Sequence, residues 1–238
     1  MKTSGGVLGI VTILATCAAT YAVPIAIFNT GVDGAGHVLS DGTIGDPHYS
    51  LVSVPFGTTV TRVRTQAGGY PANVWVGDDT ASAWIGPNNN GGILPPGAFG
   101  QVYGPVGFYD YRTTFVLPSA GTVAVVGQWA ADDTGESVTL NGASGGFFLP
   151  AGDANWTSFS IRGAGLAGVN TLDFHVQNAD QGFLEGSPMP GPTGLRVEIT
   201  SANFVANSPE PGSLGIISCG LLALLLRRRQ NRAAGSLL

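Results

Sequence analysis

The fold is indicated most clearly by one stretch of ten residues, Val169-Asn170-Thr171-Leu172-Asp173-Phe174-His175-Val176-Gln177-Asn178. From Leu172 to Gln177, apolar and polar side chains alternate at every position. Successive side chains of a β-strand point to opposite faces, so this pattern predicts a strand with one buried and one solvated face. A chain built from such strands has to bury their apolar faces against a second layer.

The same alternation recurs along the rest of the chain. Further strands are expected at residues 59–65, 73–76, 111–117, 122–129 and 193–200. Two of them, 111–117 and 122–129, are expected to pair through the connection Pro118-Ser119-Ala120-Gly121. The dipeptide Asn141-Gly142 predicts a tight turn, because both residues tolerate positive φ. Eight to ten short strands, without a helical repeat between the termini, predict an all-β two-layer sandwich with residues 86–107 as a long connection.

Composition and charge narrow the function classes. The chain has 37 Gly and 15 Pro, which favour turns, and only 11% of its residues are charged. Between Val23 and Ser208, fourteen acidic residues and five arginines give a net charge of −9. Nucleic-acid binding needs clustered Lys and Arg, so this body is not expected to bind nucleic acid. The acidic excess fits either solubility alone or carboxylates that hold a hard cation.

The cysteines exclude several kinds of site from the body. The chain has two, Cys17 and Cys219, and both lie in the terminal apolar segments. The body between them therefore has no disulfide, no thiolate metal site and no cysteine nucleophile.

The first 22 residues have the parts of a secretory signal peptide. Lys2 precedes an apolar stretch from Val7 to Ala19, and cleavage is expected after the small residue Ala22 or, alternatively, after Ala19. We therefore expect export, removal of residues 1–22 by signal peptidase, and a β-sandwich domain of residues 23–206.

The C-terminal residues 207–238 combine three features in a fixed order. These are Pro209-Glu210-Pro211, an apolar run from Ser213 to Leu226, and the cluster Arg227-Arg228-Arg229. The run is short for a free-standing bilayer span, and the arginines are expected to stay on the cytoplasmic side. Together these features resemble the PEP-CTERM sorting tail of exported bacterial proteins, many of which are associated with exopolysaccharide.

This resemblance implies a destination for the chain. The apolar run would form a short hydrophobic helix that anchors the precursor in the membrane, and an exosortase would process it for the cell surface or the extracellular matrix. Pro209, Glu210 and Pro211 would be the recognition element of that tail. Arg227, Arg228 and Arg229 would be its retention element.

The body carries a second resemblance, over about residues 75–200. It rests on the segments Trp84-Ile85-Gly86-Pro87-Asn88, Tyr111-Arg112-Thr113-Thr114-Phe115, Gly127-Gln128-Trp129-Ala130-Ala131-Asp132-Asp133, Leu140-Asn141-Gly142 and Gly168-Val169-Asn170-Thr171-Leu172. In this order they look like a galactose-binding-like β-sandwich. The resemblance implies a single jelly-roll domain, a fold found in carbohydrate-binding modules and in accessory domains of surface proteins.

Carboxylates near the end of a predicted strand form a candidate calcium site. Asp132 and Asp133 follow Trp129, and Glu136 is close by in sequence. Calcium takes six to eight oxygen ligands, which such a loop can supply. The alternative is a turn in which the Asp side chains cap backbone amides, and this alternative is more common.

Four tryptophans are candidates for stacking on sugar rings. Trp129 lies in an apolar strand and is expected in the core. Trp84 is the better candidate for an exposed platform, since Asn88 and other polar residues follow it, although core packing is an equal alternative. We take Trp84 and Asn88 as the candidate ligand-binding residues.

Catalytic motifs are missing from the sequence. His37, His48 and His175 are far apart and lack the spacing of a zinc site, and there is no Gly-x-Ser-x-Gly motif. We therefore expect a noncatalytic envelope or matrix protein that binds polysaccharide, with calcium as a candidate cofactor. The alternatives are a structural or adhesive module that contacts proteins without a sugar site and, third, a glycan hydrolase.

Overall fold

The structure is a computed structural model, which describes residues 21–55, 59–68, 74–88, 103–144, 146–180, 183–184, 187–188, 191–207, 220–221 and 224–225. Residues Ala22–Asn207 form one compact unit, and Met1–Tyr21 with Ser208–Leu238 form a second. In the second unit, Gly220, Leu221, Leu224 and Leu225 are helical. Among the described residues, no helix combines the length and the apolar character that a bilayer crossing requires.

Several predictions concern residues outside the described ones. They are the signal peptide up to residue 20, the Pro209-Glu210-Pro211 motif, the cluster Arg227-Arg228-Arg229 and most of the connection 86–107.

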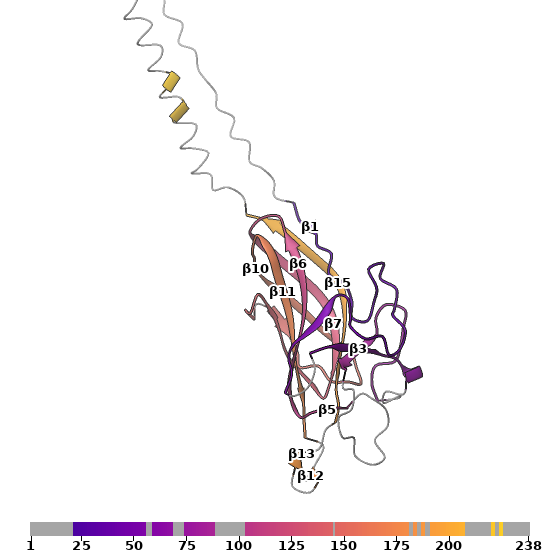
Figure 1. Cartoon of the computed structure of the whole chain (residues 1–238). Helices are drawn as coiled ribbons and strands as arrows, with labels where there is room; N and C mark the ends of the chain where they lie inside the picture. The colour runs from indigo at the N-terminus through magenta and orange to yellow at the C-terminus, as the bar shows by residue number, and fades with distance from the viewer. Residues whose placement is uncertain are drawn as a thin grey trace, which may run out of the picture. The chain divides into compact units, whose positions relative to one another are not determined.

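The compact unit is all-β and consists mainly of two antiparallel sheets (Figure 1). The seven-stranded sheet has the order β3 (Thr61–Arg64), β4 (Trp84–Pro87), β15 (Gly194–Ala206), β7 (Gly121–Asp132), β10 (Thr157–Gly165) and β9 (Gly146–Phe148), and β1 (Val23–Pro24) also pairs with β15. The four-stranded sheet has the order β2 (Tyr49–Ser53), β6 (Gly107–Leu117), β11 (Gly168–Asn178) and β8 (Thr134–Leu140).

The remaining elements are short. They are the pair β12 (Phe183–Leu184) and β13 (Ser187–Pro188), the pair β5 (Tyr103–Gly104) and β14 (Gly191–Pro192), and the 3-10 turn η1 (Gln66–Gly68).

The inner faces of the two sheets form one core. Phe174 of β11 lies 5.6 Å from Phe159 of β10 and 5.8 Å from Trp129 of β7, measured between ring centroids. All three side chains are buried, which confirms the expectation that Trp129 is a core residue. Burial of one large apolar side chain contributes about 1.5–3 kcal/mol, so this contact across the layers is a main source of stability.

The period-two pattern is confirmed in its central stretch. Residues 168–178 form β11, and Leu172, Phe174 and Val176 are fully buried. The turn at Asn141-Gly142 is also confirmed, with φ of 52° and 76°. Positive φ at both residues is what a two-residue turn between antiparallel strands requires.

The expected pairing of residues 111–117 with 122–129 is wrong. The first segment belongs to β6 in the four-stranded sheet and the second to β7 in the seven-stranded sheet. Residues 118–120 therefore connect one layer to the other. The alternation shows which face of each strand is buried. It does not show whether the next strand lies beside the first in the same sheet or opposite it in the other sheet, because the apolar face is buried in both arrangements.

Sequential strands alternate between the layers over most of the domain. In chain order, β6, β8 and β11 belong to the four-stranded sheet, and β7, β10 and β15 to the seven-stranded sheet. Hydrogen-bonded neighbours are thus mostly distant in sequence, as in the pairing of β15 with β7.

Candidate functional site

Trp84 and Asn88, the predicted ligand-binding residues, are both buried. Trp84 has no exposed surface, so the prediction of an exposed platform is wrong and its alternative, core packing, is confirmed. Its neighbour Ile85 faces the main core, which directs Trp84 to the outer face of the sheet, where it packs against Trp75. Asn88 donates its backbone N–H to the Val60 carbonyl at 2.7 Å and so extends the contact between the segments of β3 and β4.

The predicted calcium ligands are occupied by protein donors or point to solvent. Asp132 is buried and accepts a hydrogen bond from Trp75 Nε1 at 2.6 Å. Asp133 accepts one from the backbone N–H of Ala179 at 2.7 Å, and Glu136 is exposed. Within the described ranges, no group of three His, Cys, Asp or Glu side chains is placed to hold a metal ion. Calcium binding stays a prediction.

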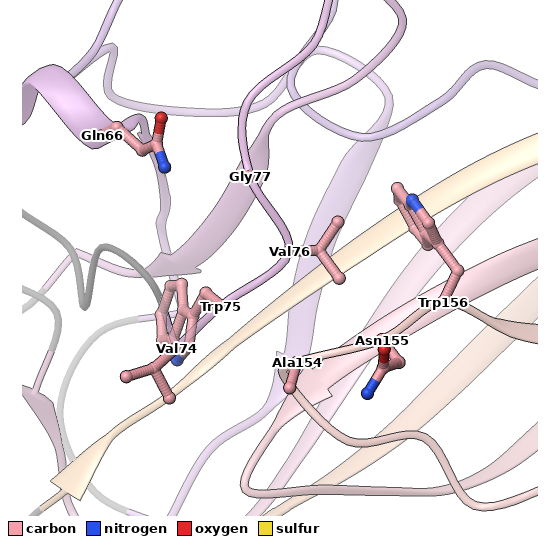
Figure 2. A pocket seen from close by; sticks show the side chains of 8 residues that line it. All are labelled: Gln66, Val74, Trp75, Val76, Gly77, Ala154, Asn155 and Trp156. Atoms are coloured by element: carbon pink, nitrogen blue, oxygen red, sulfur yellow. The ribbon is translucent and has the colours of Figure 1, made fainter.

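A pocket of about 430 Å³ lies over the outer face of the seven-stranded sheet (Figure 2). We call it the tryptophan pocket, and it is lined by Gln66, Val74, Trp75, Val76, Gly77, Ala154, Asn155 and Trp156. These residues come from the turn η1, the segment before β4 and the segment before β10. Val76 N–H donates to the Asp153 carbonyl at 2.7 Å, which links the last two of these segments.

Trp75 is held rigidly in one wall of this pocket. Its ring centroid lies 4.4 Å from that of Trp84, and its indole N–H is bonded to Asp132. Trp84 in turn donates its indole N–H to the Val76 carbonyl at 2.9 Å. Burial, and then the adjacent carboxylate of Asp133, raise the pKa of Asp132 to about 8.

Arg196 of β15 contacts the pocket segments from their buried side. Its side chain is fully buried and donates to the carbonyls of Gly77 at 2.6 Å and Ser82 at 3.0 Å. It forms an ion pair with Asp79 at 2.7 Å, and its Cζ lies 5.0 Å from the centroid of the Trp156 ring. A cation placed on a tryptophan face attracts the ring, so Arg196 fixes both the segment before β4 and Trp156.

The solvent side of the tryptophan pocket carries polar groups. Gln66 and Asn155 are exposed, and Trp156 is half-buried. Amides offer both hydrogen-bond donors and acceptors, which match hydroxyl groups, and an aromatic ring offers an apolar face. The arrangement can therefore bind a polyhydroxylated ligand with apolar C–H faces.

Sequence reasoning did not identify this pocket. Asn155-Trp156-Thr157 has the pattern of a glycosylation acceptor, and Trp156 stood out only as one of four tryptophans. The sequence gave no indication of Gln66 or Arg196, because their neighbours in the pocket are distant in the sequence: Gly77, for example, is 119 residues from Arg196. The expected strand at 73–76 is also wrong for its described part, since residues 74–76 form no strand and line the pocket instead.

The outer face of the four-stranded sheet carries pairs of polar side chains that contact each other across the strands. His175 Nδ1 lies 2.5 Å from Asp110 Oδ1, and Arg112 Nε donates to Asp173 Oδ1 at 2.6 Å. His175 keeps 33% of its side-chain surface exposed, in agreement with its expected place on the polar face of β11. These pairs are cross-strand neighbours, which stabilise the sheet by about 0.2–1 kcal/mol each.

Comparisons of the chain with protein-family models, with curated proteins and with solved structures found no match.

Proposed function

We propose that this chain is an exported, noncatalytic envelope or matrix protein that binds polysaccharide in the tryptophan pocket. One observation carries the proposal: the half-buried ring of Trp156 and the exposed amides of Asn155 and Gln66 line the same pocket. The pocket volume of about 430 Å³ lies within the range of about 300–1,000 Å³ that small-molecule sites occupy.

The rigid support of the pocket favours binding over a purely structural role. Trp75 donates its indole N–H to the buried carboxyl group of Asp132, and Trp156 lies against the buried guanidinium of Arg196. A wall that is already ordered loses little conformational freedom when a ligand binds, which favours affinity. Burial of all four tryptophans would favour the alternative hypothesis, a structural or adhesive module without a sugar site. Trp75, Trp84 and Trp129 are buried, but Trp156 is only half-buried.

Charge around the pocket indicates the type of sugar. The Asp78 carboxylate accepts a hydrogen bond from the backbone N–H of Gln66 at 2.8 Å, and Asp153, whose backbone carbonyl accepts from Val76 N–H, directly precedes the segment 154–156. Because these carboxylates repel anions, the ligand is expected to be a neutral or amino sugar rather than a uronate or a sulfated unit.

The fold and the ends of the chain support the same assignment. Two antiparallel sheets with strands that alternate between them fit a jelly roll of the galactose-binding-like type. The segments 1–22 and 207–238 fit a signal peptide and a PEP-CTERM tail, so signal peptidase and an exosortase are the proposed partners during export. We place the mature protein at the cell surface or in the extracellular matrix.

Glycan binding tests the pocket directly. The purified chain is titrated with the host's exopolysaccharide and with defined neutral and uronate-containing oligosaccharides, with calcium and with a chelator. Trp156→Ala is expected to weaken binding roughly tenfold, the loss that one stacked aromatic ring produces. Asn155→Ala and Gln66→Ala remove exposed side chains and are expected to weaken binding without a loss of stability.

Phe108→Ala is the matched control for the loss of an aromatic ring. Phe108 is 59% exposed and belongs to β6 in the other sheet, so its removal is expected to leave binding unchanged. If no glycan binds the folded chain, or if Trp156→Ala and Phe108→Ala bind equally, the tryptophan pocket is not a sugar site.

The sorting tail has its own test. Replacement of Arg227, Arg228 and Arg229 by Ser is expected to impair membrane retention of the precursor, because the arginines no longer oppose translocation of the tail. Fractionation of cells that produce either form measures this. If the variant is retained and trimmed like the parent, the PEP-CTERM assignment is refuted.

A further inference from the structure

One end of the domain carries no charged side chain among the residues that the structure describes. We call it the uncharged end, and it comprises residues 22–26, 116–120, 164–169 and 204–207. Cross-strand pairs bring these segments together: Val23 with Phe204, Val116 with Val169, and Gly121 with both Gly165 and Ala206 (Figure 1). The sequence has no Asp, Glu, Lys, Arg or His between Arg112 and Asp132, between Arg162 and Asp173, or between Glu198 and Glu210.

This lack of charge contrasts with the rest of the domain. The body of the chain has fourteen acidic residues. Three of them, Asp132, Asp133 and Asp180, lie at the other end of β7 and β11 or just beyond it. The twelve residues of β7 separate the two ends by about 36 Å at the usual rise per residue.

The uncharged end exposes large apolar side chains. Val116, Val169, Leu166 and Val23 are 70%, 64%, 55% and 55% exposed. Next to them an apolar groove of about 410 Å³ is lined by residues 23–26 and 116–119 with Phe204 and Ala206. A concentration of exposed apolar surface at one place on a soluble domain marks an interaction site.

We propose that the uncharged end docks on the surface of a lipid bilayer. The chain leaves the domain at this end, and the apolar run that begins at Ser213 follows Asn207 by six residues, which reach at most about 21 Å when fully extended. Exposed Val and Leu side chains can enter the interfacial layer, and the absence of carboxylates there avoids repulsion from anionic headgroups. The inference rests on the membrane attachment of the tail stated under Proposed function, but not on sugar binding.

In the docked state the acidic end and the tryptophan pocket point away from the membrane. Trp129 and Asp132, which adjoin the pocket segments, belong to the half of β7 that is remote from Gly121. Docking would therefore hold residues 208–212, with the Pro-Glu-Pro motif, near the membrane surface, while the pocket faces outward to polysaccharide.

Fluorescence quenching by lipids tests the docking with the full chain. Cys17 and Cys219 are replaced by Ser, and one environment-sensitive dye is attached at Leu166→Cys or, as a control at the other end, at Ala154→Cys. The chain is reconstituted in phosphatidylcholine–phosphatidylglycerol vesicles with nitroxide-labelled lipids. We expect a blue shift and strong quenching at position 166, and neither at position 154.

A matched pair of charge substitutions separates docking from mere proximity to the tail. Val116→Glu and Thr114→Glu alter exposed residues on the same face of β6, two positions apart. Val116→Glu is expected to abolish the quenching at position 166, and Thr114→Glu to preserve it. The docking is refuted if the vesicle-bound chain shows no quenching at 166, if both variants behave alike, or if the end instead joins two copies in light scattering.

The two proposals fail in different ways. If the chain does not sediment with vesicles at all, the membrane attachment is wrong and the docking with it, whatever the glycan titration shows. If the chain is bound through its tail but position 166 is unquenched, only the docking is overturned.

Discussion

The carboxyl group of Asp132 is expected to make the stability of the domain depend on pH. Its pKa is raised to about 8 in the folded domain, by burial and then by Asp133, from 3.8 in an unfolded chain. Between these two values the folded state binds the proton more tightly than the unfolded state. Stability from this group is therefore fully present below about pH 4 and is lost as pH rises toward 8.

The magnitude follows from the width of that window. Each pH unit between the two pKa values lowers the free energy of unfolding by about 1.4 kcal/mol, so this one group removes about 3 kcal/mol between pH 5 and pH 7. Asp132→Asn is neutral at every pH and still presents an amide oxygen to the Trp75 indole N–H. The variant is expected to lack this slope and to exceed the parent in stability at pH 7.

Urea unfolding of residues 22–207 at pH 5, 6, 7 and 8 measures the difference. The buried apolar clusters lie within this unit, and tryptophan fluorescence reports its unfolding. Burial also raises the pKa of Asp46, but that group is common to both proteins and cancels in their comparison. If the stabilities of parent and variant change in parallel with pH, Asp132 is ionised in the folded domain and the reasoning fails.

Two further substitutions test the support of the pocket and the turn. Arg196→Met leaves the carbonyls of Gly77 and Ser82 without their donor and is expected to lower the free energy of unfolding in urea by about 3–5 kcal/mol. The control Arg162→Met changes an exposed arginine and is expected to alter this free energy by less than about 0.5 kcal/mol. Equal effects would mean that the buried guanidinium does not hold the segment. Gly142→Ala is expected to cost about 1 kcal/mol in thermal unfolding because its φ is 76°, while Gly152→Ala, which has open space and ordinary φ, is the neutral control.

The candidate site could be predicted only in part. The sequence singled out tryptophans and clustered aspartates, and the structure places Trp75 and Trp156 in the lining of the tryptophan pocket and Asp132 beside it. The sequence identified Trp129 as a core residue, but it could not show which of Trp75, Trp84 and Trp156 borders solvent, since each of these three lies near polar residues. Trp84 is covered by Trp75 from a segment nine residues earlier, while Trp156 borders solvent because Arg196 holds it on the outer face of the sheet.

The sequence by itself determined the local features of this protein. The alternation from Leu172 to Gln177 predicted β11 and its buried face, and the dipeptide Asn141-Gly142 predicted the turn that follows β8. Both signals are local, because the side-chain period of a strand and the tolerance of positive φ depend on neighbouring residues alone. The tertiary structure decided the rest. It placed β6 and β7 in different sheets, built the tryptophan pocket from three separate segments and gathered the uncharged end from four, because strand pairing brings together residues that no local pattern connects.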